Sequence, residues 1–218
     1  MKNKCLFCQT KKIKQDILWN SKDFYVKVGV GILAPGHVML IPKKHVRCLA
    51  ELSAPLIRQF LSVKESIFNG LKANFSMPIL YEHGIYGQSI NHAHLHLLPE
   101  KSRYYNLEKI EDNLFRGLKR SRLESFAELK EIFKNEGSYF YLEVHGKKWV
   151  FHTKDKPEGK YIFRKEFARF TGMHGLANWQ TMPEGEKEKN KEWVNLTKEK
   201  LEIEPKHLYT STSPTSRK

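Results

Sequence analysis

Residues 87–99 read GQSINHAHLHLLP, with histidines on alternate positions at His92, His94 and His96. The residues between the histidines are apolar, so the stretch predicts a β-strand from 90 to 98 whose successive side chains face opposite sides of a sheet. The imidazoles then share one face and the apolar side chains pack on the other. Because imidazole titrates near neutrality, this row predicts a reaction centre. The alternatives are a tag-like or adventitious metal-binding tract, or partly buried histidines satisfied by hydrogen bonds. A solvent-facing tract would not need strict alternation with aliphatic residues.

A second group of candidate ligands begins near the N-terminus, where Cys5 and Cys8 form a CxxC motif. This spacing lets two thiolates bind one zinc ion, although it also suits a redox pair. No βαβ pattern surrounds the motif, which counts against a thioredoxin-like role. His45 and His92 could supply two nitrogen ligands. The sequence therefore predicts one structural zinc ion in a closed tetrahedral site.

These motifs carry a family resemblance. In order and spacing, CLFC at 5–8, PGHVMLIPKKH at 35–45 and GQSINHAHLHLLP at 87–99 resemble the histidine triad (HIT) superfamily of nucleotide hydrolases and transferases. The resemblance covers roughly the first hundred residues of the chain. It implies a set of zinc ligands at Cys5, Cys8, His45 and His92. It also implies a nucleophile at His94, substrate-binding residues at Gln88, Ser89 and His96, and a supporting residue at His37.

The implied reaction is nucleotidyl transfer. His94 would attack the α-phosphorus of a phosphoanhydride or phosphoramidate, and water or another acceptor would resolve the covalent nucleotidyl-histidine. Uridylyltransferases of the superfamily carry glutamine at the third triad position, so His96 favours a hydrolase. The alternatives are a nucleic-acid-directed deadenylating enzyme and a nucleotide-binding protein without turnover.

The sequence also departs from the family pattern. Gly29 stands where an aspartate often holds the ribose hydroxyls, and Tyr81 stands where an asparagine is common. The usual base-and-ribose pocket is therefore not expected. We expect His83 to be a turn histidine that is hydrogen-bonded locally, and Arg164 to be an exposed helix arginine.

Composition agrees with a single intracellular enzyme. The 218 residues are 40% hydrophobic, which is enough to bury a core. The three cysteines leave Cys48 unpaired once the metal takes two, and no apolar N-terminal stretch suggests a signal, so we expect a cytoplasmic protein without disulfides. The net charge of +14 favours anionic partners, nucleotides above all. Its dispersed lysines make nucleic acid the lesser expectation, membranes are not expected, and a homodimer is possible.

The expected fold is α+β: a HIT-like antiparallel sheet with packed helices, followed by a C-terminal hairpin and helix extension. The predicted division is a core with the zinc site and triad at 1–102, an α+β extension at 103–190 and a partly disordered tail at 191–218. Periodicity predicts strands at 23–33, 37–41, 76–82 and 90–98, helices at 55–70, 123–133 and 161–170, and a hairpin of 139–145 with 148–152.

Overall fold

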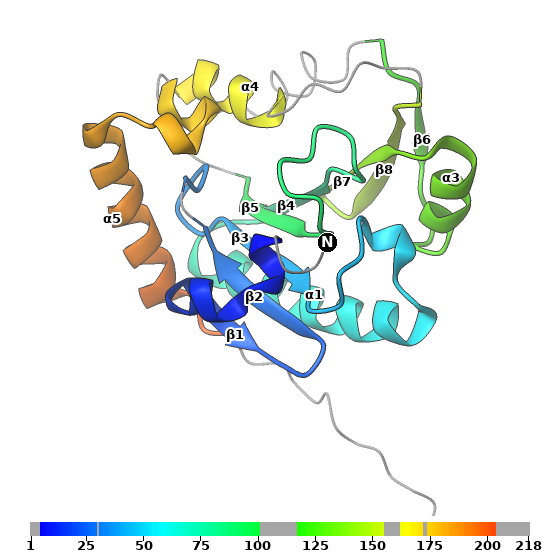
Figure 1. Ribbon diagram of the computed structural model, residues 1–218, viewed down its shortest axis with the longest axis horizontal. Helices are drawn as coiled ribbons and strands as arrows, with labels where there is room; N and C mark the ends of the chain where they lie inside the picture. Colours follow the sequence, from blue (N-terminus) through cyan, green and yellow to red (C-terminus); the bar gives the residue numbers. More distant parts are fainter. Residues whose placement is uncertain (1–4, 30, 101–116, 155–161, 172–173, 204–218) are drawn as a thin grey trace, which may run out of the picture.

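One antiparallel sheet runs through the protein (Figure 1). The computed structural model describes residues 5–29, 31–100, 117–154, 162–171 and 174–203. Within these residues, eight strands pair in the order β1-β2-β3-β5-β4-β7-β8-β6. The strands are β1 Ile17–Asn20, β2 Phe24–Val28, β3 Val38–Pro42, β4 Pro78–Glu82, β5 Leu95–Pro99, β6 Arg120–Arg122, β7 Tyr139–Val144 and β8 Lys147–His152.

Helices surround this sheet. The α-helices are α1 Ala54–Asn74, α3 Glu128–Glu136, α4 Ile162–Thr171 and α5 Glu184–Lys200. The shorter 3-10 segments are η2 Leu6–Cys8, η3 Thr10–Asp16, η4 Leu49–Glu51, η5 His174–Ala177 and η6 Trp179–Thr181. Figure 1 shows α5 beside the β1–β2 end of the sheet and α3 beside β7 and β8.

The face of the sheet that packs on α1 is apolar around the triad strand. Leu95 pairs with Leu40, and Leu97 lies between Val38 and Leu80. Residues directly opposite one another in an antiparallel pair share a face, so these aliphatic side chains form one layer. The layer meets the buried side of α1, formed by Phe60, Val63, Ile67 and Leu71. The predicted packing of the apolar residues between the histidines is therefore confirmed.

The opposite face carries a row of polar and aromatic residues. Lys27 pairs with Met39, Met39 with His96, and His96 with Tyr81 across four neighbouring strands. Because they are successive cross-strand partners, their side chains project from the same side of the sheet. Phe163 of α4 covers one end of the row, stacking on Tyr81 with ring centroids 4.1 Å apart. One face of the sheet is thus apolar and packs on α1, and the other carries polar and aromatic side chains.

The predicted triad strand is shorter than the alternation suggested. β5 begins at Leu95, and residues 90–94 are irregular. Ala93 donates its N–H to Val46 O, and the ring of His92 donates to Pro42 O, which a ladder partner would otherwise use. One backbone bond outside the ladder and one side chain–backbone bond therefore take the place of strand pairing before residue 95. The strand predicted over 23–33 likewise ends at Val28.

The other elements agree with the prediction to different degrees. The β7–β8 hairpin is confirmed, and His145 and Gly146 have φ of 49° and 74°, as a two-residue hairpin turn of type I′ requires. The long helix begins as expected but continues to Asn74. The helix predicted over 123–133 is shifted, since α3 starts at Glu128. β1, β6 and α5 were not predicted.

The predicted domain boundaries stay predictions. Strands β6, β7 and β8 of the second half continue the sheet of the first half through the β4–β7 pair. α5 crosses the expected boundary between 190 and 191. Residues 204–218 of the expected tail lie outside the described residues. A search of the described helices finds none with the length and apolar character that a membrane span needs.

Candidate functional site

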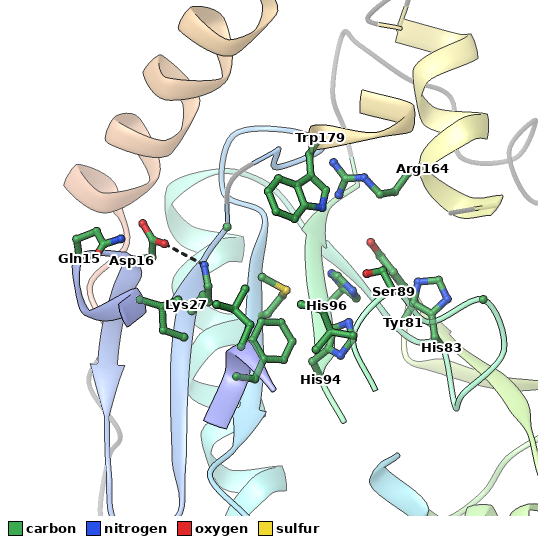
Figure 2. A pocket seen from close by; sticks show the side chains of 17 residues that line it. Gln15, Asp16, Lys27, Tyr81, His83, Ser89, His94, His96, Arg164 and Trp179 are labelled. Carbon is green, nitrogen blue, oxygen red and sulfur yellow. Dashed lines mark hydrogen bonds and ion pairs between the residues drawn. The ribbon is translucent and has the colours of Figure 1, made fainter. Parts of the chain in front are cut away.

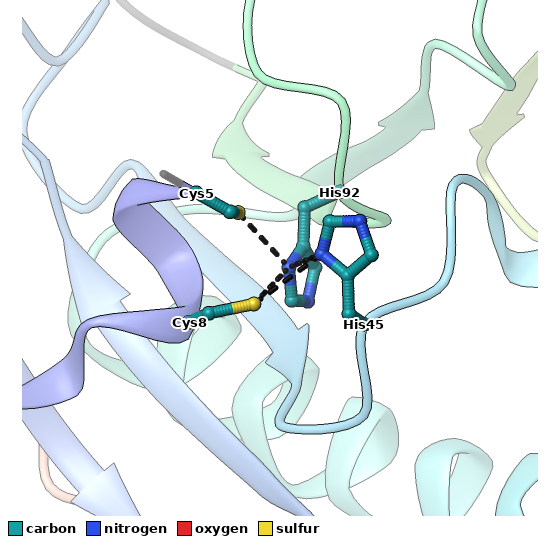
Figure 3. A group of neighbouring side chains, drawn as sticks. All are labelled: Cys5, Cys8, His45 and His92. Carbon is teal, nitrogen blue, oxygen red and sulfur yellow. Dashed lines mark hydrogen bonds between the residues drawn. The ribbon is translucent and has the colours of Figure 1, made fainter. Parts of the chain in front are cut away.

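Four potential metal ligands converge beside the N-terminal segment (Figure 3). One ligand atom from each of Cys5, Cys8, His45 and His92 lies within 4.8 Å of all the others. The Sγ atoms of Cys5 and Cys8 lie 3.4 Å and 3.5 Å from His92 Nδ1, and His45 Nδ1 lies 3.2 Å from the same atom. These residues come from η2, the segment after β3 and the segment before β5. Their side chains could hold a metal ion.

The hydrogen bonding of His92 tests whether a cation fits. Its Nε2 lies 2.7 Å from Pro42 O, and a carbonyl oxygen can only accept, so Nε2 carries the proton. A neutral ring then presents a lone pair at Nδ1 toward two sulfur atoms and the second imidazole. Such a convergence of electron-rich atoms is favourable when a cation lies among them, and two sulfurs with two nitrogens are a zinc-type donor set. The residues present fit the predicted metal.

A cavity of about 260 Å³ lies next to this cluster, on the polar face of the sheet (Figure 2). Both His94 and His96 line it, with their ring centroids 4.8 Å apart. His92 points instead to the metal-ligand cluster. His92 thus lies among the potential metal ligands, as the sequence predicted, although the chain before Leu95 is not the strand that the predicted shared face assumed. The triad is divided between two adjacent sites.

His94 is held in one protonation state. Its Nδ1 lies 2.7 Å from His92 O and must donate to that carbonyl, which leaves Nε2 of the neutral ring without a proton. Burial lowers the pKa of His94 to about 3, although the hydrogen bond to the carbonyl opposes this effect. At neutral pH the ring is therefore uncharged, with a lone pair on Nε2.

A chain of hydrogen bonds places the proton of His96 on Nε2, the nitrogen that is unprotonated in His94. Leu33 N donates to His37 Nδ1, so the proton of the neutral His37 ring is on Nε2. This Nε2–H donates to His96 Nδ1 at 2.9 Å, and the proton of His96 is therefore on its own Nε2. Burial lowers the pKa of both rings, that of His37 to about 3. His94 thus has an unprotonated Nε2, whereas His96 has a protonated Nε2 that can donate.

The remaining predicted substrate residues lie in different places. Ser89 lines the cavity. Gln88 does not belong to the lining: its side-chain amide donates to Arg47 O and His92 O and so supports the loop before the triad. His83 donates from Nδ1 to Tyr86 O, as expected of a turn histidine, yet its ring also lines the cavity, 6.4 Å from that of His94.

The end of the cavity away from His83 combines apolar walls with an ion pair. Its apolar walls come mainly from the N-terminal segment and its neighbours, namely Leu6, Phe7, Ile13, Met39 and Ile90. Lys27 Nζ lies 3.2 Å from Asp16 Oδ2 and donates to Val28 O, with only 5% of its side chain exposed. Burial lowers the pKa of Lys27, while Asp16 opposes this effect. Gly29 also lines this end of the cavity but has no side chain. The carboxylate at this end belongs to Asp16.

Arg164 was expected on an exposed helix surface, and this expectation is wrong. The side chain is half-buried and lines the cavity together with Trp179. Its guanidinium donates from Nε to Leu176 O at 3.0 Å and from Nη2 to Gly31 O. Periodicity cannot reveal this placement, because it depends on how α4 lies across the sheet.

This chain is similar in sequence to proteins of a known family. Residues 10–103 match the family model of the HIT domain. CWF19-like protein 1 of Homo sapiens is 21% identical over 155 residues, which is 68% of this chain but only 28% of that protein. The bis(5'-adenosyl)-triphosphatase of Saccharomyces cerevisiae (strain YJM789) is 24% identical over 118 residues, 52% of this chain and 55% of that protein. This chain thus spans well under two thirds of the length of either relative.

Among solved structures, a Zn-bound histidine triad family protein from Mycobacterium smegmatis is 17% identical with a TM-score of 0.38, covering 47% of this chain and 79% of the other. The family model matches the part of the chain that holds β1 to β5, His45 and all three triad histidines. Residues 10–103 of this chain are therefore identified as a HIT domain.

Proposed function

We propose that this protein is a nucleotidyl hydrolase or transferase that acts through a covalent nucleotidyl-histidine at His94. The observation that carries the proposal is the tautomer of His94. Its Nδ1–H is fixed on His92 O, so that the unprotonated Nε2 belongs to a ring that lines a cavity. A neutral imidazole with one nitrogen anchored by a carbonyl is a suitable nucleophile for phosphorus.

The neighbouring side chains support this chemistry. Attack on the α-phosphorus places extra negative charge on the phosphoryl oxygens, which preorganised donors stabilise. His96 offers Nε2–H and Ser89 offers its hydroxyl, and both line the same cavity as His94. The adjacent apolar walls formed by Phe7 and Ile13 suit a nucleobase, since aromatic and aliphatic surfaces bind flat rings.

We further propose that Cys5, Cys8, His45 and His92 hold one structural zinc ion. When bound, the ion supplies a rigid link between the N-terminal segment and the residues before β5. All four ligand positions are taken by protein atoms, so water activation is not required of it. His92 O is the acceptor for His94, and fixing His92 therefore also fixes the nucleophile.

Substitution of His94 tests the proposal. His94→Ala should abolish turnover of a panel of nucleotidyl phosphoanhydrides and phosphoramidates, and wild-type protein mixed rapidly with substrate should release a burst of leaving group. Mass spectrometry should find the nucleotidyl adduct on His94. His145→Ala is a matched control, because that exposed histidine lies on the β7–β8 turn and pairs with Glu100. Full activity of His94→Ala, with folding and metal content unchanged, would remove this residue from the mechanism.

The same assay distinguishes a small nucleotidyl substrate from a nucleic-acid substrate. Adenylated DNA included in the panel would show whether the chain acts on a polynucleotide end. A nucleic-acid substrate stays the alternative, and a homodimer and a cytoplasmic location stay predictions.

A further inference from the structure

Helix α4 brings a cationic side chain to the reactive end of the cavity. Phe163 anchors the helix by stacking on Tyr81, the cross-strand neighbour of His96. Arg164 follows it directly and lines the cavity with His94 and His96 (Figure 2). The second half of the chain, beyond the HIT domain match, thus completes the wall of the site.

The guanidinium group is positioned by the backbone. Leu176 O accepts from Nε and Gly31 O accepts from Nη2, which orients the plane of the group. Gly31 has a φ of 69°, and a Cβ there would lie 2.8 Å from Nη2 and 2.5 Å from Trp179 Cβ. Only glycine allows this close approach without strain. A guanidinium held in this way is preorganised for an anion, because little side-chain entropy remains to be lost.

The charges that line the cavity are distributed unevenly. Lys27 lies at the end lined by the N-terminal segment and is paired with Asp16. At the triad end burial lowers the pKa values of His83 and His96, so these two rings are neutral at pH 7. The positive charge of Arg164 adds to this depression for His83 and His96, so its field reaches the triad. This end of the cavity is therefore complementary to an anion.

We propose that Arg164 binds the phosphate on the far side of the scissile bond, so that the preferred substrate is a phosphoanhydride whose leaving group is itself a phosphate. This inference rests on the proposed function. In the first step the bond from His94 Nε2 to the α-phosphorus forms while the bond from that phosphorus to the bridging oxygen breaks. The leaving phosphate keeps the electron pair, and its new negative charge lies against the guanidinium. Water then displaces His94 from phosphorus, releasing a nucleoside monophosphate and a proton.

Equilibrium binding tests this assignment without turnover. In the His94→Ala background, ADP should bind more tightly than AMP, and adding Arg164→Gln should weaken ADP binding by about 10- to 100-fold while AMP binding changes little. This range is that of charge-assisted hydrogen bonds removed from a partly buried site. Arg164→Lys should restore part of the ADP affinity, because it keeps the charge but not the two-pronged geometry. Isothermal titration calorimetry measures all of these constants.

Two control variants separate phosphate binding from a structural role. Asn190→Ala loosens the same loop, since Asn190 Oδ1 accepts from Gly31 N and Ile32 N, but it removes no charge. Arg169→Gln removes one positive charge from the exposed side of the same helix, where Arg169 pairs with Glu166. Neither variant should remove the preference for ADP over AMP.

A turnover measurement gives an independent readout. With His94 intact, Arg164→Gln should lower kcat/KM for an adenosine polyphosphate but not for adenosine 5′-phosphoramidate, whose leaving group carries no phosphate. Equal losses for AMP and ADP, or an Arg169→Gln variant that reproduces the effect, would overturn the role of Arg164 and leave the proposed function intact. If the His94→Ala protein binds neither nucleotide, the proposed function fails first and this inference fails with it.

Discussion

At the scale of the residue, the partner of one ring nitrogen decides what each triad histidine can do. His92 and His94 both donate to carbonyl oxygens, but from opposite nitrogens, so one presents Nδ1 to the metal-ligand cluster and the other keeps Nε2 unprotonated. His96 accepts from His37 and retains a donor. The three histidines therefore present different ring atoms to their surroundings.

The link from His37 to His96 gives a specific prediction. His37→Phe removes the donor that fixes the His96 tautomer, so His96 should populate both neutral forms. We expect kcat to fall by roughly tenfold, less than the ~100-fold cost of losing a transition-state donor outright, because part of the population keeps the donor. ¹⁵N chemical shifts of His96 would report the tautomers directly, and metal content serves as the control for folding. A single unchanged His96 tautomer in the variant would show that His37 does not set it.

Glu82 is a buried carboxyl group behind the site. Its two oxygens accept from Leu49 N at 2.7 Å and from the Tyr139 hydroxyl at 2.6 Å. Burial nevertheless raises the pKa of Glu82 to about 7, although both hydrogen bonds oppose the shift. The folded protein therefore binds this proton more tightly than the unfolded chain does.

The sign of the resulting pH dependence follows from linkage. Between pH 4.5 and about 7 the folded state holds more protons at Glu82, so its contribution to stability is largest at low pH and is lost as pH rises through 7. The stability of wild type relative to Glu82→Gln should therefore fall by about 2 kcal/mol from pH 5 to pH 8. Urea unfolding at both pH values measures it, and Glu131→Gln on the exposed side of α3 should show no such trend. A constant difference would contradict the raised pKa.

At the scale of the element, the N-terminal segment is held to the sheet by few contacts. Phe7 and Ile13 form a small cluster with Tyr25 and Ile41, and the Tyr25 hydroxyl donates to Phe7 O. The 3-10 segments η2 and η3 make no strand pairing of their own. The ring of Phe7 also packs edge-on against the rings of His92 and His94. A metal ion bound by the four ligands would add a further link between this segment and the residues before β5.

Cys8→Ser should consequently affect both stability and binding. We expect the loss of bound zinc, a decrease of more than about 3 kcal/mol in unfolding free energy, and weaker nucleotide binding, because Phe7 and Ile13 line the cavity. Elemental analysis and thermal unfolding measure the first two. Cys48→Ala is the matched control: this buried cysteine lies outside the cluster, so one equivalent of zinc should remain. Zinc retained in full by Cys8→Ser would contradict the assigned ligand set.

Helix α5 shows what an element distant in sequence does for the site. Asn190 accepts from Gly31 N and Ile32 N and donates to Ile32 O, while Thr197 accepts from Gly36 N. Buried backbone N–H groups need such partners, and the glycine-containing segment after β2 has none in the sheet. α5 therefore shapes the wall of the cavity without lining it.

At the scale of the whole molecule, the second half of the chain continues the sheet of the HIT domain. β7 pairs with β4 directly beside the triad strand, and one hydrophobic cluster includes buried residues of both halves. Separate domains would each have their own core. The predicted division at residue 102 thus describes a family boundary, and its meaning for folding needs a test.

We predict a single cooperative unfolding transition. Scanning calorimetry should give a calorimetric enthalpy equal to the van't Hoff enthalpy, because breaking the β4–β7 pair exposes buried residues on both sides. Hydrogen exchange of β5 and β8 should then report the same global opening free energy. Two resolved transitions would support the predicted independent extension instead.

The sequence by itself predicted which residues gather at the site. The spacing of CLFC, PGH, IPKKH and HAHLHL predicted the four potential metal ligands that converge in the structure and the HIT domain, since these local motifs need only a few fixed residues. Alternation with aliphatic residues identified the buried face correctly from Leu95 onward. Turn chemistry located the β7–β8 hairpin for the same reason, because its positive-φ residues are adjacent in the chain.

Only the tertiary structure decided the register and the distant contacts. The row from Lys27 through Met39 and His96 to Tyr81 depends on three strand pairings that no local pattern specifies. The orientation of His92 and the approach of Arg164 both involve hydrogen bonds to carbonyls far away in sequence. Backbone carbonyls carry no sequence signature, so partners of this kind become visible only once the chain is folded.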